Sequence, residues 1–404
     1  MSSRGSTRVA RDATRMRRRP RLALAAALLA GATCGAGAVA PGALASPVPH
    51  GGGGRHAPVV VSATPDQRLD AAWRRFGNTG GGWHNRGGWA AADGTYSTRL
   101  PGGQIAWLFN DTFLGPVNPD ESLPSRAGFV HNSIVLAGRD GLPQTTLTGG
   151  TQQKPESLVG ATPTKPPWDP DGANDRWYWN TDGIVDGGKL RVFELAQAPS
   201  DDEPPFNFQW VGTDIATFSH DLRSARVTPS YDEGNVQWGV ELIRHGGYIY
   251  IYGVEGVPFN KYMHIARARV GHLVERSWEF YTGSGWSRDP TASARVLDDV
   301  GSSYGVTPVD GYFVLTTSNA TLGHEVYVAT APTPTGPFTN RKAVYTAPEG
   351  GGNIYAPYNI AAHPDLSRRG ELVISYNVNS QRIEDLYANI NNNRARYLRL
   401  RFAR

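Results

Sequence analysis

Hydrophobic and polar residues alternate in short runs along this chain. Stretches such as "QIAWLFN" and "GYIYIYGV" are rich in Val, Ile, Tyr and aromatic residues, and turns that contain Gly or Pro separate them. Alternation with a period of two is typical of β-strands, whereas long stretches with an apolar period of 3.6 are absent. We therefore predict an all-β protein without a long amphipathic helix.

Five units of similar design follow one another at spacings of roughly 55 to 75 residues, which is typical of propeller blades. Each unit has two strands joined by a turn and then a third strand. The joined strands are predicted at 95–100 and 104–110, 181–185 and 189–196, 238–244 and 248–254, 304–309 and 312–317, and 358–362 and 371–376. The third strands are predicted at 129–138, 211–219, 262–270, 324–331 and 395–402. The pattern predicts a five-bladed β-propeller, with two separate β-sandwiches as the alternative.

The N-terminal segment resembles an export signal. Arginines precede the apolar run "LALAAALLAGA", and a small-residue cleavage pattern, "ALA", ends at Ala45. We predict a signal peptide over 1–45, a Gly-rich linker over 46–57 and a propeller domain over 58–404, in which a strand near 57–63 closes the ring. The protein is expected to be secreted and extracellular, with no membrane contact once the leader is cleaved.

Charge and cysteine content change once this leader is removed. The leader carries eight Arg and one Asp, so the formal net charge falls from +4 to −3. No basic patch for nucleic acid is implied. Cys34 is the chain's one cysteine and lies in the leader, which excludes thiol catalysis and Cys-based zinc sites from the mature chain. We expect a monomer that needs no cofactor and no metal.

Aromatic residues are frequent, with 11 Trp and 17 Tyr. In a secreted all-β protein, aromatic faces can stack on sugar rings, although most such side chains belong to the core. Candidates for a sugar platform lie on predicted inner strands or nearby loops: Trp83, Trp179, Trp238, Tyr304 and Tyr358.

The first predicted hairpin carries a carboxylate at each foot. Its turn is centred on Gly102, so residues whose numbers sum to 204 oppose each other, as Asp93 and Asp111 do. Directly opposed residues have Cβ atoms ~5 Å apart, and two carboxylates that close separate into an acid and a base. The third strand starts at the same end and brings His131 and Asn132 near. The alternative is that both aspartates only cap turns.

The stretches "DGTYSTRLPGGQIAWLFNDTFLG" and "FVHNSIVL" resemble a family of secreted five-bladed propellers long known as a domain of unknown function. Some members are endo-D-arabinanases, which cut the arabinan of mycobacterial cell-wall arabinogalactan. The resemblance implies that Asp93 and Asp111 carry catalysis, with inversion, and it leaves the substrate open. Two positions depart from the family pattern: Asn110 replaces a Gly and Gln104 replaces an Arg. The matching residues are Asp93, Gly94, Ser97, Leu100, Trp107, Phe109, Asp111, Thr112, Phe113, His131, Asn132 and Ser133.

Other five-bladed glycosidases suggest a second assignment. In these enzymes a base comes from the first blade, an Asp that tunes a pKa from the second, and a Glu acid from the third. Asp182 and Glu241 lie on the predicted inner strands of blades two and three, so they can play these parts beside Asp93.

Together these features predict a secreted glycoside hydrolase acting on an arabinan-type polysaccharide. The candidate catalytic residues are Asp93, Asp111 and Glu241, and the candidate substrate-binding residues are His131, Asn132, Asp182, Trp179, Trp238, Tyr304 and Tyr358. A non-catalytic sugar-binding propeller and a structural, partner-binding propeller are the alternatives. Retention needs carboxyls ~5–5.5 Å apart and inversion ~6.5–9.5 Å, which the sequence alone does not decide.

Overall fold

The computed structural model describes residues 56–83, 88–160, 176–202 and 207–403. The predicted signal peptide therefore lies outside the described residues, as does the linker except for its last two residues. No helix in the described part of the chain is long and apolar enough to cross a membrane.

The described residues form antiparallel sheets, and five of these sheets have four or five strands. The first contains β3 (Tyr96–Arg99), β4 (Ile105–Phe109), β7 (Ser133–Ala137) and β8 (Pro143–Leu147). The second contains β11 (Trp177–Asp186), β12 (Lys189–Pro199), β13 (Phe208–Phe218) and β14 (Ala225–Pro229). The third contains β15 (Val236–His245), β16 (Tyr248–Val257), β17 (Asn260–Arg269), β18 (Glu279–Tyr281) and β19 (Trp286–Ser287). The fourth contains β20 (Gly305–Val309), β21 (Tyr312–Thr317), β22 (Glu325–Ala331) and β23 (Thr339–Thr346).

The fifth sheet joins the two ends of the described chain. It contains β24 (Ile354–Ala362), β25 (Glu371–Ser380), β26 (Arg396–Phe402) and, as its outer strand, β1 (Val60–Pro65). β1 pairs with β26 from Val60 opposite Phe402 to Pro65 opposite Leu398. The predicted closing strand is therefore confirmed, two to three residues later in the chain than expected.

Shorter elements accompany the five larger sheets. The additional strands are β2 (Trp89–Ala92), β5 (Thr112–Leu114), β6 (Gly128–Val130), β9 (Gly149–Thr151) and β10 (Lys154–Glu156). They form a three-stranded sheet in the order β2-β5-β6 and a two-stranded sheet of β9 and β10. The helices are α1 (Gln67–Asn78) and α2 (Ile383–Ala388), with 3-10 turns at Glu233–Asn235, Pro290–Ala292, Pro364–Leu366 and Ile390–Asn393.

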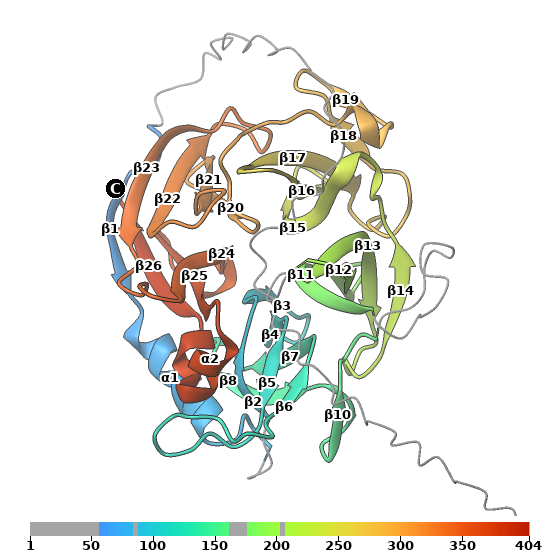
Figure 1. The fold of residues 1–404 in the computed structure, drawn as a ribbon. Coiled ribbons are helices and arrows are strands. Elements are labelled where there is room, and N and C mark those ends of the chain that lie inside the picture. The colour runs from blue at the N-terminus through green and yellow to red at the C-terminus, as the bar shows by residue number, and fades with distance from the viewer. Residues whose placement is uncertain (1–55, 84–87, 161–175, 203–206, 404) are drawn as a thin grey trace, which may run out of the picture.

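The sheets stand around a common axis as a β-propeller, with β3, β11, β15, β20 and β24 innermost (Figure 1). The all-β prediction is confirmed. The blade count of five stays a prediction, which the five larger sheets support. Connections from the second to the third strand of each sheet, together with the starts of the innermost strands, share one end of the ring, which we call the mouth.

The register predicted for the first hairpin is confirmed. Ser97 pairs with Trp107, and beyond β3 and β4 the same register continues where Ala92 pairs with Thr112. Between these pairs, the Asp93 amide donates to the Asp111 carbonyl at 3.0 Å. The two aspartates are therefore opposed on the backbone, as the turn centre requires.

Helix α1 is a short amphipathic helix that the sequence analysis did not predict, although it agrees with the expectation that the chain has no long one. The Asp66 side chain caps it by accepting the amides of Arg68 and Leu69. Leu69, Trp73 and Phe76 form its buried stripe and pack on the first sheet. The signal was present in the sequence as an Asp followed by apolar residues at helical spacing, but the helix has only 12 residues.

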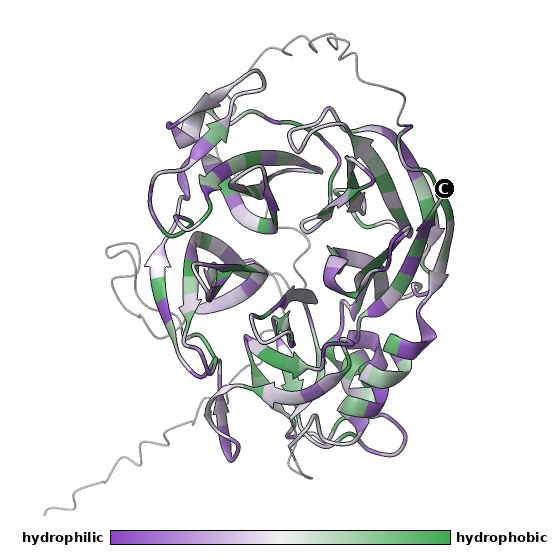
Figure 2. Cartoon of the chain, turned by 180° about the vertical axis from the view of Figure 1, so that it is seen from behind, coloured by the Kyte–Doolittle hydropathy of each residue, from purple (hydrophilic) through white to green (hydrophobic). Residues whose placement is uncertain are grey.

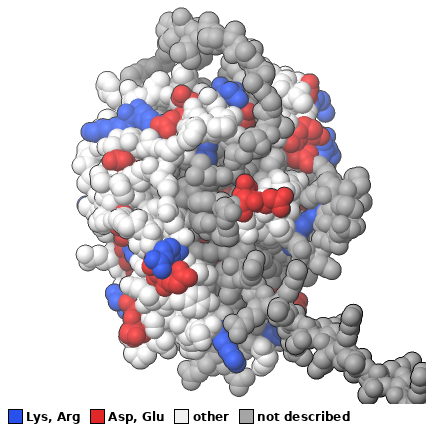
Figure 3. Space-filling view, in the orientation of Figure 1, with Lys and Arg blue, Asp and Glu red and all other residues white. Residues whose placement is uncertain are grey.

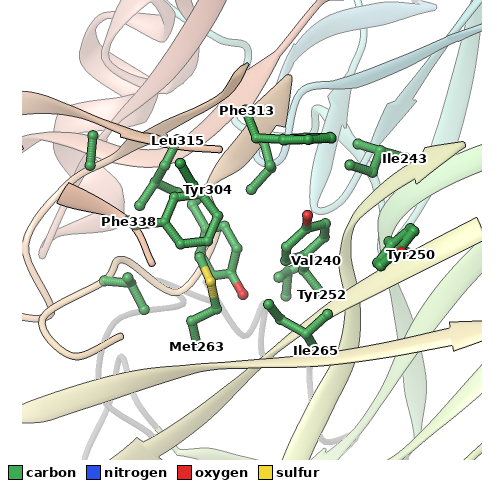
Figure 4. Close-up of a cluster of buried hydrophobic side chains, with 14 of the residues drawn as sticks. Val240, Ile243, Tyr250, Tyr252, Met263, Ile265, Tyr304, Phe313, Leu315 and Phe338 are labelled. Atoms are coloured by element: carbon green, nitrogen blue, oxygen red, sulfur yellow. The ribbon is translucent and has the colours of Figure 1, made fainter. Parts of the chain in front are cut away.

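The core lies between neighbouring sheets. One cluster joins the third and fourth sheets through Val240, Tyr252, Tyr304 and Leu315 (Figure 4). Hydrophobic segments lie mainly in the inner strands, and hydrophilic ones are more frequent in outer strands and loops (Figure 2). This difference follows from burial, because inner strands are covered on both faces by adjacent sheets, whereas the outer strand β23 is largely exposed.

Candidate active site

Asp93 lies at the mouth, in the short link between β2 and β3. Its Oδ1 accepts the Gly94 amide at 2.6 Å and the Asn359 side-chain amide at 2.8 Å, and Tyr358 also forms a side-chain hydrogen bond with this carboxyl. The side chain is buried, and burial is the main reason that its pKa rises to about 7. The nearby charge of Asp111 raises it further.

Asp111 is buried beside Asp93 and holds two aromatic rings. Its Oδ1 accepts a hydrogen bond from His131 Nδ1 at 2.8 Å and another from Trp179 Nε1 at 3.0 Å. The His131 ring also stacks on Trp177, with ring centroids 4.9 Å apart. These contacts confirm that His131 comes near Asp111. They make Asp111 a hydrogen-bond acceptor that holds the side chains of His131 and Trp179 at the mouth, between the first two sheets.

Asp182 connects the second and third sheets. Its Oδ1 accepts the Gly183 amide and its Oδ2 accepts the Leu242 amide, both at 2.8 Å. Burial raises its pKa to about 7, against the opposing effect of these two hydrogen bonds. The side chain thus reaches across to the strand that carries Glu241.

Glu241 is buried on β15, next to the residue whose amide binds Asp182. Burial, and after it the charge of Asp182, raises the pKa of Glu241 well above its ordinary value. The Val306 amide donates to this carboxyl from the fourth sheet. The environment of Glu241 therefore favours its protonated form, and neighbouring sheets contact it from both sides.

β-Bulges aim these acids toward the axis. The β11–β12 register shifts between Asn180 and Gly183, where Asp182 lies, and the β15–β16 register shifts between Trp238 and Glu241. A bulge inserts an extra residue, bends the strand and redirects a side chain that regular alternation would turn toward a neighbouring sheet. The sequence pattern does not reveal these bulges.

Three of the carboxyls converge on one side chain. The Tyr96 hydroxyl is buried, and after burial the charges of Asp93, Asp182 and Glu241 contribute to a pKa above its ordinary value. These acids come from the first, second and third sheets. The structure therefore brings together residues that are up to 148 positions apart in the sequence.

A pocket open to solvent lies beside these acids, with Tyr96, Thr181 and Asn359 in its lining, although none of the four carboxyls lines it. One wall is apolar and aromatic, and most of the remainder is polar, with Lys261 as its cation; burial lowers the pKa of Lys261 to about 8. A small number of polar groups that point into a pocket beside aromatic side chains is typical of a small-molecule or sugar site. The lining residues are Tyr96, Asn110, Trp179, Thr181, Leu195, Gln197, Phe208, Trp210, Gln237, Val254, Gly256, Lys261, Ser302 and Asn359.

Several predicted sugar contacts are wrong in this structure. Trp238 and Tyr304 are fully buried in the cores of the third and fourth sheets, where sugar has no access. Trp83 is buried and donates to the Thr146 carbonyl. Asn132 is also fully buried, and its side chain bonds the backbone of Val159 and Tyr178. These residues connect structural elements because inter-sheet packing uses large side chains.

Two other predicted contacts lie at the site. Trp179 lines the pocket and bonds Asp111, and Tyr358 is buried against Asp93. Asn359, by contrast, was not predicted, although it bonds Asp93 and lines the pocket. Its φ of +46° and the register shifts around it in β24 come from the bulged strand, which left no clear signal in the sequence.

The described residues visible in Figure 3 show no single sign of charge. On the face that Figure 3 shows, acidic and basic residues lie in small groups, several of them side by side. Within the described residues, no group of three or more His, Cys, Asp or Glu side chains is arranged to hold a metal ion.

Comparison with known proteins gives a family and a fold. The family model described as "Domain of unknown function (DUF5005)" matches residues 60–404, whereas no curated protein matches the chain. A candidate hydrolase from Bacteroides ovatus has a similar structure, with a TM-score of 0.65 and 22% identity over 84% of this chain and 90% of that one. This likeness shows a shared fold.

Two further solved structures are more distant. An exo-β-1,3-galactanase from Phanerochaete chrysosporium, bound to β-1,3-galactotriose, gives a TM-score of 0.45 and 10% identity over 76% of this chain and 60% of that one. A GH43_1 enzyme from Xanthomonas citri, complexed with xylotriose, gives a TM-score of 0.44 and 13% identity over 83% of this chain and 92% of that one.

Proposed function

Because the chain belongs to the DUF5005 family, whose description names no reaction, we propose a function from the site itself: the protein is a glycoside hydrolase. The observation that carries this proposal is the convergence of Asp93, Asp182 and Glu241 around Tyr96, a residue that lines an aromatic pocket. Glycoside hydrolysis needs one protonated carboxyl and one carboxylate on opposite sides of a glycosidic bond. In this proposal Glu241 supplies the first and Asp93 the second.

Glu241 is the general acid in this proposal. Burial raises its pKa and so favours the protonated form that an acid needs, and the charge of Asp182 contributes to that rise. Asp93 is the general base, because its pKa of about 7 lies near the working pH, and the hydrogen bonds donated by Gly94 and Asn359 favour its charged form against the effect of burial. Asp182 is a positioning residue that acts through Glu241.

The proposed reaction is a single displacement with inversion. Glu241 gives its proton to the glycosidic oxygen as the bond from that oxygen to the anomeric carbon breaks. Asp93 takes a proton from water, whose oxygen bonds the anomeric carbon from the opposite face. Asp111 instead holds His131 and Trp179 at the pocket edge, so it replaces neither partner in this scheme.

We further propose an arabinan-type polysaccharide as the substrate, cut within the chain outside the cell. The resemblance of residues 93–113 and 131–133 to endo-D-arabinanases supports the substrate, and the leader pattern over 1–45 supports secretion. The test is incubation of the mature protein with arabinans, arabinogalactans and galactans, followed by chromatography of released sugars and NMR of the first anomer formed.

Variants distinguish the two acid assignments. Asp93→Asn and Glu241→Gln should each fold normally and lose at least about a hundredfold in rate, because a general acid or base contributes ~10²–10⁴-fold. Asp111→Asn should retain a larger share of the rate than Glu241→Gln. The reverse order would show that the opposed pair Asp93 and Asp111 is the acid–base pair. Binding of polysaccharide without any sugar release would favour a non-catalytic sugar-binding propeller.

A further inference from the structure

Phe259 is the most exposed large hydrophobic side chain in the described part of the protein. It is 83% exposed, compared with 42% for Leu322 and 56–63% for Val59 and Val61 near the N-terminal edge. It lies at the tip of the hairpin between β16 and β17, where turns usually carry Gly, Asn, Asp or Ser. Nothing in the fold requires an aromatic ring at this position.

The backbone of Phe259 is also in an unfavourable conformation. Val257 pairs with Asn260, so Pro258 and Phe259 form a two-residue turn, and the φ of Phe259 is +62°. A turn with Pro first and a positive φ second normally has Gly or Asn at the second position. The left-handed region costs free energy for a residue with a bulky side chain, and such costs concentrate at functional sites.

The hairpin forms part of the rim of the pocket. Gly256 and Lys261, which flank the tip, both line the pocket. The Lys261 ammonium donates to the Ala320 carbonyl in the neighbouring loop between β21 and β22, and that loop carries the second exposed residue, Leu322. The exposed apolar surface of the mouth therefore continues outward from the pocket.

We propose that Phe259 is a platform for a second sugar-binding subsite outside the pocket, which makes the protein a binder of chains several sugars long. This inference rests on the proposed glycosidase function. A sugar ring stacked on the exposed phenyl face would remove apolar surface of both partners from water. The pocket would hold the sugar at the scissile bond, and the platform would hold a more distant sugar of the same chain.

The test compares Phe259→Ala with wild type on a long and a short substrate. The substrates are a polysaccharide cut by the wild type and a chromogenic aryl glycoside or disaccharide that fills only the pocket. We expect kcat/KM on the polysaccharide to fall about tenfold through KM, with the short substrate unchanged. Phe259→Trp should retain the wild-type value because it keeps an aromatic face. Val61→Ala removes an exposed apolar side chain from β1 and should change neither value.

The outcomes separate the platform from the reaction. If the wild type releases sugar and Phe259→Ala is equally active on both substrates, or equally impaired on both, the platform is refuted and the glycosidase stands. If no sugar is released, affinity electrophoresis in gels that contain each polysaccharide measures binding directly. Retardation that is lost in Phe259→Ala and kept in Phe259→Trp would then support the platform while the glycosidase fails. No retardation of the wild type on any polysaccharide would refute both.

Discussion

Gly239 controls how β15 presents Glu241, and its replacement by Ala tests that relation. The residue lies in the bulge between Trp238 and Glu241 and has a φ of +88°. A Cβ added here would lie 2.1 Å from Cγ of Phe193, 2.3 Å from its Cδ1 and 2.4 Å from its Cβ. Phe193 is fully buried in the core between the second and third sheets, so it has no free space to enter.

Two terms set the expected loss of stability. A non-glycine residue in the left-handed region costs ~1–2 kcal/mol. Overpacking of a filled core costs ~1–3 kcal/mol. Gly239→Ala should therefore lower the free energy of unfolding by about 2–5 kcal/mol. It should also lower sugar release, because relief of the clash requires movement of the strand that carries Glu241.

Urea denaturation followed by tryptophan fluorescence measures the loss, and Gly247→Ala is the matched control. Gly247 has a similar φ of +81° in the turn after β15, but no heavy atom lies within 4 Å of its added Cβ. The control therefore retains the backbone term of ~1–2 kcal/mol and removes the clash. If Gly239→Ala is no more destabilised than Gly247→Ala, the bulge tolerates a side chain and this account of Glu241 positioning is wrong.

Other changes test the buried acids and ring closure. Burial raises the pKa of Glu194, whose two carboxyl oxygens have no hydrogen-bond partner among the described residues. The contribution of Glu194 to stability is therefore full below its unfolded pKa and is lost as the pH rises through its folded pKa. In urea titrations from pH 4 to 9, Glu194→Gln should gain stability relative to wild type as the pH rises, and a constant difference would contradict this. The same sign applies to Asp93, whose pKa is about 7, so Asp93→Asn should gain relative stability mainly between pH 4 and 7, by a few kcal/mol at most. A chain that begins at Thr64 loses most of β1 and exposes the edge of β26. Calorimetry should therefore show a melting temperature at least ~5 °C below that of a chain that begins at Ala57. Equal melting temperatures would mean that β1 does not stabilise the ring.

Several local features of this protein follow from its amino-acid sequence alone. The turn at Gly102 sets the pairing of Ser97 with Trp107, because a short turn leaves one register for its flanking strands, and the same count placed Asp93 opposite Asp111. The closing strand was visible as an apolar run without a partner nearby. Helix α1 was also encoded locally, by Asp66 and the stripe after it, and could have been predicted by weighing a short helical period beside the strand pattern.

Which of these features form a site depends on contacts between sheets that lie far apart in the chain. Asp182 and Glu241 lie at bulges in β11 and β15, and the adjacent sheet packs closely on the second of these, since a Cβ on Gly239 would meet Phe193. The same packing buries Trp238 and Tyr304, which the sequence could not distinguish from the pocket residue Trp179. Inter-sheet contacts join residues far apart in the chain, and alternation along a strand cannot say which neighbour will cover each face.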